Sequence, residues 1–464
     1  MNKKQSHQVF IGEMVQQRSE RNIKGEFVNM LGDTFYKLHD FDGMPPFFMS
    51  IVSSSNHWLF ISSTGGLTAG RTSAEQALFP YYTDDKVTEN NENTGTKTIF
   101  LVTRKKQKIL WEPFSERHRG IYQIERNIYK NISGTAILFE ELNHSLQLAY
   151  RYAWRTSDLF GFVKTSWLRN FSKSKCQVEL LDGIQNILPA QVTSLTQNTF
   201  SPLLDAYKRS ELDLDTGLAI LALNSTLTDL AEPSESLLST VTFQAGLKPA
   251  HYLLSSTQLD SFRAGKIIQT EREMRGKRGA YFVHALLELA SAKEHAWHIV
   301  ADVSKDGGEI VSLQNKIKAG KSKLAKSLEE DIAINNHNLE KIVASADGVQ
   351  ISSDALCTAH HFANVMFNVM RGGIISDQYR IQKEALVDFI SIRNHILLAE
   401  NENFFTELPP VFSVLDLHSR AEATGSADLI RLSYAYLPLS FSRRHGDPSR
   451  PWNRFAIDVK KTDG

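Results

Sequence analysis

The sequence predicts a β-rich chain with a helical C-terminal part, in which a large antiparallel β-sandwich (a supersandwich) precedes a long helix and several further helices. Two observations support this fold class. Apolar residues alternate with a period of two from residue 27 to about residue 304, and they recur with a helical period from residue 306 onward. Since few helix-period segments separate the strands, antiparallel sheets packed face to face are favoured over a parallel α/β sheet.

The strand assignment is clearest in residues 146–154, where every even position is large and apolar while Gln147 and Arg151 are polar. This alternation places the apolar side chains on one face of a pleated strand. The same period over 281–289 and 297–303, joined by the turn-like Ser291–His295, predicts a hairpin. The region exceeds the ~100 residues of an immunoglobulin-type sandwich. We therefore expect one large sandwich over 1–304, with a short helix near 205–212.

A long helix is predicted to follow the sandwich. Asp306 and Glu309 have the spacing of a capping box, and apolar residues then recur at helical steps from Ile310 to Ile342. At 1.5 Å per residue this helix would be a rod of roughly 50 Å. Gly320 and the following lysine interrupt the apolar stripe, which favours a connecting helix over a dimerising coiled coil.

The helical period continues to the C-terminal region. Helices are expected over 352–371, 382–400 and 412–435, the last of them broken at Gly425, and a loop is expected from residue 440. The predicted domains are therefore a sandwich over 1–304, a helical linker over 305–350 and a helical domain over 351–464.

Composition excludes several classes of protein. With 52 basic and 52 acidic residues the formal charge is zero, which argues against a strongly cationic nucleic-acid-binding protein. Two cysteines provide neither a disulfide framework nor a cysteine zinc site, and they fit a reducing compartment. No export signal and no run of about 18 apolar residues is visible, so we expect a cytoplasmic protein without a membrane partner.

The most unusual segment lies near the C-terminus and combines four arginines, a histidine, a carboxylate and an indole within twelve residues. Planar guanidinium groups suit oxygen-rich ligands, and an indole face suits the C–H face of a pyranose ring. The alternative is a surface loop whose arginines pair with acidic neighbours. The sequence thus predicts an oligosaccharide-binding segment that contains Arg443, Arg444, His445, Asp447, Arg450, Trp452 and Asn453.

Other candidate sites are weaker. The glycine-rich stretch 65–71 lacks the Lys-Ser/Thr pair of a phosphate loop and predicts a turn between two strands. Residues 79–85 join aromatic rings to two carboxylates, where core packing beside an acidic turn is favoured over stacking on a sugar. His360 and His361 point about 100° apart on a helix and cannot chelate one metal together, so no metal site is expected. Cys357 fits a small buried side chain.

Several segments resemble the N-terminal region of large bacterial proteins of the cellobiose-phosphorylase-like and glycoside hydrolase group. They include PFFMSIV at 46–52, VELLDGIQNILP at 178–189 and FANVMFNVMRGG at 362–373, together with 58–71, 79–85 and 443–455. The resemblance extends over nearly the whole chain. It implies a β-sandwich, a linker helix and the start of an α/α barrel, in the order that the residue patterns predict.

The resemblance also implies chemistry on a glycosidic bond of glucan-type oligosaccharides. In such enzymes an acidic side chain of the barrel protonates the leaving oxygen, and phosphate or an activated water attacks. A barrel needs about a dozen helices, whereas only three or four are predicted after Ser352. We therefore expect an incomplete barrel without the catalytic acid. No catalytic residue and no cofactor is predicted, apart from inorganic phosphate as a co-substrate.

Two partners are expected from the resemblance besides the oligosaccharide: a second copy in a homodimer, or a downstream catalytic domain. An alternative of a different class stays open. The sandwich would then be a non-catalytic module that binds glycans or a partner polypeptide.

Overall fold

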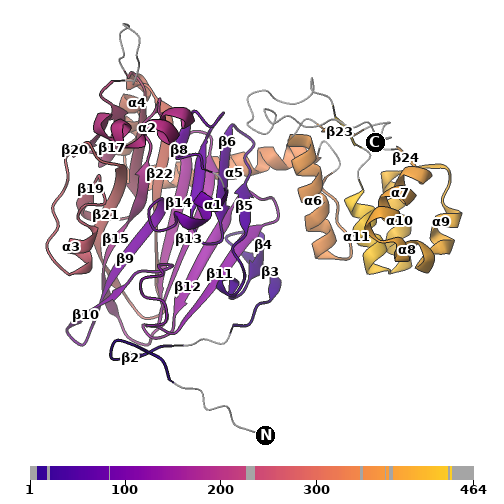
Figure 1. Ribbon diagram of the computed structural model, residues 1–464, viewed down its shortest axis with the longest axis horizontal. Helices are drawn as coiled ribbons and strands as arrows, with labels where there is room; N and C mark the ends of the chain where they lie inside the picture. Colours follow the sequence, from indigo (N-terminus) through magenta and orange to yellow (C-terminus); the bar gives the residue numbers. More distant parts are fainter. Residues whose placement is uncertain are drawn as a thin grey trace. The chain divides into compact units, whose positions relative to one another are not determined.

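The computed structural model of the protein divides into two compact units (Figure 1). The β unit comprises Met1–Ser53 and His57–Ala333, and the helical unit comprises Ser54–Asn56 and Ile334–Gly464. Each unit is considered by itself. The structure describes residues 8–17, 21–82, 84–225, 236–344, 348–370, 373–375, 380–436 and 439–441.

Antiparallel sheets make up most of the β unit, as the sequence predicts. Within the described residues the largest sheet has eleven strands, in the order β20 (Glu273–Arg275), β16 (Lys208–Asp213), β17 (Leu218–Leu223), β18 (Ser239–Ala245), β22 (Glu294–Lys305), β14 (Gly161–Asn170), β13 (Leu148–Ser157), β12 (Ile137–Asn143), β11 (Ile124–Asn131), β4 (Asp33–Leu38) and β3 (Gly25–Met30).

Smaller sheets accompany it in the described part of the β unit. A five-stranded sheet has the order β10 (Gln107–Trp111), β9 (Gly95–Arg104), β15 (Cys176–Ile187), β21 (Gly279–Leu289) and β19 (Pro249–Leu253). A four-stranded sheet contains β5 (Phe48–Ile51), β6 (His57–Ser62), β7 (Leu67–Arg71) and β8 (Ala77–Phe79), and a small hairpin pairs β1 (Phe10–Ile11) with β2 (Met14–Val15).

One hydrophobic cluster joins the three larger sheets. In β13, alternate residues from Leu148 to Trp154 are at most 2% exposed, which confirms the buried face that the period of two predicts. The cluster also contains Phe100 of the five-stranded sheet and Leu59 of the four-stranded sheet. The core of the β unit is therefore shared among sheets whose strands lie far apart in the sequence.

The predicted hairpin between residues 281–289 and 297–303 is wrong. Strand β21 pairs with β15 and β19 in the five-stranded sheet, whereas β22 pairs with β14 and β18 in the eleven-stranded sheet. The connection Ser291–His295 thus leads from one sheet to another. Tyr281 and Trp297 both lie in the shared cluster, because each strand turns its apolar face toward the same core. Periodicity identifies the buried face of a strand, not its neighbour.

The helix expected near 205–212 lies earlier. Helix α2 covers Ser194–Tyr207 and begins at a capping box between Thr193 and Thr196. Residues 208–213 form β16, in which Lys208, Ser210 and Leu212 are buried and alternate with partly exposed residues. Two short helices, α1 (Asp84–Glu89) and α3 (Leu259–Arg263), and the 3-10 turn η1 (Phe41–Gly43) complete the β unit before residue 306.

The predicted capping box at Asp306 is confirmed: its side chain accepts from the Glu309 N–H, and the Glu309 side chain accepts from the Asp306 N–H. The single long rod, however, is two helices, α4 (Gly307–Lys318) and α5 (Lys321–Ala344). Gly320 has a φ of +130°, which an L side chain rarely adopts, and it ends the helical path. Buried Ile317 and Leu328 share a cluster with strand residues of the β unit.

The helical unit contains short helices and two small sheets. Among its described residues are α6 (Ala355–Met370), α7 (Lys383–Arg393), α8 (His395–Glu400), α9 (Glu402–Glu407), α10 (Val414–Thr424) and α11 (Ala427–Ala435), with β23 (Gly373–Ile375) paired to β26 (Leu439–Phe441) and β24 (Arg380–Gln382) paired to β25 (Val411–Ser413). The predicted break at Gly425 is confirmed, since this residue ends α10 with a φ of +67°. These described helices form no closed barrel.

A buried ion pair lies in the shared core of the β unit. The ammonium of Lys164 is 2.5 Å from Asp182 Oδ1, and both side chains are 0% exposed. Asp182 also accepts from Thr98 Oγ1 at 2.5 Å and from Trp297 Nε1 at 2.7 Å. Burial lowers the pKa of Lys164, while Asp182 opposes this shift. The pair therefore holds two charges that are stable only together.

Replacing Lys164 with methionine should reduce the free energy of unfolding by about 3–5 kcal/mol, because the Asp182 carboxylate would stay buried without its cation. Urea unfolding measures this loss. Lys108→Met is the matched control, since Lys108 pairs with Glu179 but is 52% exposed, and it should cost less than about 1 kcal/mol. Equal losses in the two variants would contradict the assignment.

The helical unit contains a buried histidine, His418, whose ring stacks on Tyr434 at a centroid distance of 3.9 Å. The ring of His361 approaches the ring of His418 edge-on, at a centroid distance of 5.3 Å. Burial, aided by the nearby His361, lowers the pKa of His418 to about 4. The unfolded chain would bind this proton near the ordinary pKa of 6.5. The folded state holds His418 neutral, and the stabilisation linked to this is therefore complete above pH 6.5. It declines as the pH falls from 6.5 toward 4, because the unfolded chain then binds the proton more readily than the folded chain.

We expect the stability of the helical unit to fall by about 1.4 kcal/mol for each pH unit between pH 6.5 and 4, owing to His418. Hydrogen exchange at the α10 amides measures this free energy of opening. His418→Leu should remove this part of the pH dependence, whereas His360→Leu, at an exposed position, should leave it unchanged. An unchanged slope in His418→Leu would exclude His418 as its origin.

Candidate functional site

The predicted oligosaccharide-binding segment lies outside the described residues, so its assignment stays a prediction. This applies to every residue nominated for it: Arg443, Arg444, His445, Asp447, Arg450, Trp452 and Asn453.

The four-stranded sheet has two different faces, and this difference creates a site. Leu59 and Leu67 point into the shared core of the β unit, as the period of two requires. Phe60 and Thr68 alternate with them and pair directly across β6 and β7. Phe48 of β5 lies two positions from Ser50, the cross-strand partner of Phe60, and so shares its face. An aromatic surface therefore covers the side of the sheet opposite the core.

This surface lines a cavity of about 510 Å³, which we call the aromatic cavity. Phe48, Phe60 and Thr68 contribute from the sheet, and Tyr81 and Tyr82 from the segment after β8. Lys86 of α1 and Asn198 of α2 complete the lining. The volume is within the ~300–1,000 Å³ that is typical of small-molecule sites.

A buried tryptophan packs beside the aromatic rings, on the same face of the sheet. Trp58 is 1% exposed, contacts Tyr81 edge-on at a centroid distance of 5.4 Å and lies 6.3 Å from the ring of Phe60. Its indole N–H donates to the Ser73 carbonyl at 3.2 Å. Packing and this hydrogen bond fix Trp58, which therefore supports the two rings that contact it, Phe60 and Tyr81.

Polar groups complete the aromatic cavity. Thr68 is 2% exposed, and its hydroxyl has no hydrogen-bond partner among the described residues. The ammonium of Lys86 is 5.9 Å from the ring centroid of Tyr82, and the side chain of Asn198 is exposed. A buried hydroxyl without a partner is unfavourable until a ligand supplies one. The cavity thus offers flat apolar faces beside hydroxyl, amide and ammonium groups.

Sequence reasoning found only part of this cavity. For residues 79–85 the sequence favours core packing over stacking on a sugar; Phe79 does lie in the core, whereas Tyr81 and Tyr82 line the cavity. Phe48 and Thr68 were not nominated. The available signal was an aromatic residue at alternate positions of neighbouring strands, on the face that the core does not use.

The weaker candidates behave as ordinary structural residues. Gly65, with a φ of +93°, forms the predicted turn between β6 and β7. His361 is buried and its Nδ1 is 2.9 Å from the Tyr434 carbonyl, whereas His360 is exposed. Burial raises the pKa of Cys357 to about 12, which fits an inert thiol. Where the structure describes side chains, no three potential metal ligands gather.

None of the described helices has both the length and the apolar composition of a membrane span.

Comparison with known proteins assigns part of the helical unit. Residues 376–438 match the sequence model of "Glycoside hydrolase family 149 insertion domain 1". The match confirms, over this segment, the resemblance to glycoside hydrolase proteins. It describes an insertion domain, so the assignment of 351–464 to the start of a barrel stays a prediction. No curated protein matches the sequence.

Solved structures show weaker likenesses. A provisionally assigned kojibiose phosphorylase from the human microbiome is 11% identical with a TM-score of 0.39, and the match covers 79% of this chain and 47% of that chain. A bacterial glucoamylase complexed with acarbose is 9% identical with a TM-score of 0.35, covering 83% of this chain and 52% of the other. Both TM-scores are below 0.5, so neither structure assigns a fold or an activity. The chain spans about half the length of these proteins.

Proposed function

We propose that this chain is part of a carbohydrate-active protein of the glycoside hydrolase and phosphorylase group, and that the aromatic cavity binds a glucan-type oligosaccharide. The single observation that supports the ligand class is the composition of the cavity. Four aromatic rings line it together with Thr68, whose buried hydroxyl has no hydrogen-bond partner among the described residues. The match of residues 376–438 to a glycoside hydrolase insertion domain supports the same class of protein.

The chemistry of a pyranose suits this lining. Each face of the ring presents axial C–H groups, which pack against an aromatic face, while its equatorial hydroxyls point outward. Tyr82 and Phe48 would contact the ring faces, and the Thr68 hydroxyl would pair with a sugar hydroxyl. Lys86 and Asn198 would donate to further hydroxyls at the exposed side. The volume of about 510 Å³ leaves room for more than one sugar ring.

The described lining of the aromatic cavity has no carboxyl side chain, the group that protonates the glycosidic oxygen in most glycoside hydrolases. It contains aromatic, hydroxyl, amide and ammonium groups only. We therefore infer that this cavity positions the oligosaccharide and that cleavage takes place elsewhere, with phosphate or water as the acceptor. The catalytic acid would belong to a helical barrel of the complete protein.

The proposal includes the arrangement of the domains. The eleven-stranded and five-stranded sheets share one hydrophobic cluster, which supports a β-sandwich as the scaffold of the aromatic cavity. Residues 305–350 would act as the linker and 351–464 as the beginning of the barrel, interrupted by the inserted segment 376–438.

Removing one aromatic ring should weaken oligosaccharide binding. We expect Tyr82→Ala and Phe48→Ala each to reduce the affinity for gluco-oligosaccharides about tenfold, equivalent to about 1.4 kcal/mol, because a stacking surface is lost. Isothermal titration measures the affinity. Both side chains are partly exposed, so the melting temperature should change little.

Phe171→Ala is the matched control, since Phe171 is an exposed aromatic residue outside the cavity lining, and its affinity should equal that of the wild type. Unchanged affinity in both cavity variants would exclude the aromatic cavity as the glucan site. Binding of a partner polypeptide in place of every glycan would favour the non-catalytic alternative.

A further inference from the structure

A second cavity, of about 380 Å³, lies in the β unit and shares no lining residue with the aromatic cavity. We call it the charged cavity. Its lining includes the apolar side chains of Phe41 and Phe114. Two carboxylates and two guanidinium groups also line it: Asp42, Glu116, Arg119 and Arg126.

Asp42 supplies the clearest sign of a missing partner. Its side chain is only 9% exposed, and its Oδ2 accepts from Arg21 at 2.6 Å. The other oxygen, Oδ1, is buried without a hydrogen-bond partner among the described residues. Burial raises the pKa of Asp42, and nearby arginines only partly offset it. A ligand that donates a hydrogen bond to Oδ1 would satisfy this group.

The wall that contains Phe114 is held in a fixed conformation. Phe114 has a φ of +62°, and its N–H donates to Glu141 Oε2 at 2.8 Å. Glu141 also accepts from Trp111 Nε1 at 2.8 Å and from Arg126 Nε at 2.9 Å. The Phe114 ring meets Tyr152 edge-on at a centroid distance of 5.4 Å. One buried carboxylate thus fixes both an aromatic and a cationic residue of the cavity.

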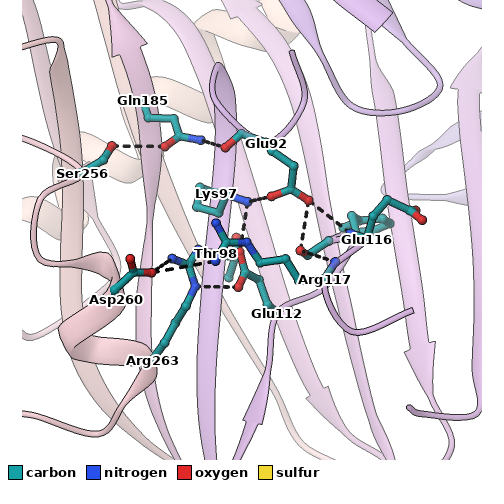
Figure 2. A network of polar contacts seen from close by, with 12 residues as sticks. Glu92, Lys97, Thr98, Glu112, Glu116, Arg117, Gln185, Ser256, Asp260 and Arg263 are labelled. Carbon is teal, nitrogen blue, oxygen red and sulfur yellow. Dashed lines mark hydrogen bonds and ion pairs between the residues drawn. The ribbon is translucent and has the colours of Figure 1, made fainter. Parts of the chain in front are cut away.

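A network of ion pairs fixes the same segment on its other side (Figure 2). Glu92 Oε1 accepts from Ser115 Oγ at 3.0 Å and from the Glu116 N–H at 3.1 Å. Lys97 contacts both Glu92 and Glu112, and Arg263 donates twice to Glu112, at 2.8 and 2.9 Å. Segment 112–116, which lines part of the charged cavity, is therefore held by side chains of strands β9, β11 and β12 and of helix α3.

The two carboxylates and two guanidinium groups of the lining carry equal and opposite charge, which restricts the charge of a ligand. Arg126 donates to Glu141, to Glu116 at 3.1 Å and to the Ser115 carbonyl at 3.3 Å, so each of its three nitrogens makes a hydrogen bond within the protein. Glu116 also accepts from Arg119 at 2.9 Å. An anion would meet the carboxylates of Asp42 and Glu116, and a cation would meet the guanidinium groups. An uncharged molecule with hydroxyl groups avoids both penalties.

We propose that the charged cavity binds a single neutral sugar ring, with one hydroxyl donating to Asp42 Oδ1 and one apolar face against Phe114. The volume is near the lower end of the ~300–1,000 Å³ range of ligand sites, which favours one ring over a chain. This site goes beyond the proposed function, because it shares no residue with the aromatic cavity and does not require it.

The test is a titration of the full chain with methyl glucoside and, separately, with inorganic phosphate, followed by ligand-observed NMR. Methyl glucoside should bind, and phosphate should not compete with it. Asp42→Asn keeps the shape of the side chain but puts an N–H donor in place of one acceptor, and it should weaken binding at least tenfold. Met44→Trp should also abolish binding, because Met44 lines the cavity and a larger side chain would fill it.

The Tyr82→Ala variant separates this proposal from the proposed function. It alters the aromatic cavity alone, so methyl glucoside should bind the charged cavity of this variant with wild-type affinity. Failure of methyl glucoside to bind the wild type would overturn the proposal, as would tighter binding of phosphate. Wild-type affinity in both Asp42→Asn and Met44→Trp, with unchanged melting temperatures, would overturn it as well.

Discussion

The β unit depends on one buried carboxylate, that of Asp182, which belongs to the five-stranded sheet and contacts residues of both large sheets. A carboxylate away from water is stable only when its oxygens are fully paired. Its partners come from five side chains: Lys164, Thr98, Tyr150, Ser166 and Trp297. The contacts of Lys164 and Trp297, which come from the eleven-stranded sheet, are 2.5 and 2.7 Å long and directional, so they fix the distance and the offset between the two sheets more strictly than apolar packing does.

Local features of the fold could be predicted from the sequence, and non-local ones could not. The period of two identifies the buried face of 146–154. The cap at Asp306 and the break at Gly425 are predictable because each depends on a few neighbouring residues. The neighbours of a strand depend on distant segments. Strands β21 and β22 are close in sequence and equally apolar on one face, yet they pair in different sheets. At Gly320 the sequence predicts only an interruption of the apolar stripe, whereas the positive φ of this glycine separates two helices.

The aromatic cavity could likewise be predicted only in its local part. Tyr81 and Tyr82 are adjacent, so their shared aromatic character is visible in the sequence. Phe48 and Thr68 reach them only through the register of β5, β6 and β7, which no single segment encodes. Thr68 in particular looks like an ordinary strand residue until the lack of a partner for its hydroxyl is known. The charged cavity escaped prediction for the same reason, since Asp42 and Phe114 are far apart in the chain.

The helical unit includes Ser54–Asn56, three residues that interrupt the β unit near its beginning. Ser54 donates its backbone N–H to Asn335 Oδ1 at 3.2 Å, which joins this short excursion to a helix almost three hundred positions later. Neither unit is consequently a continuous stretch of polypeptide. A gene fusion that exchanged everything after residue 333 for a different sequence would therefore also remove Asn335, the acceptor of the Ser54 N–H.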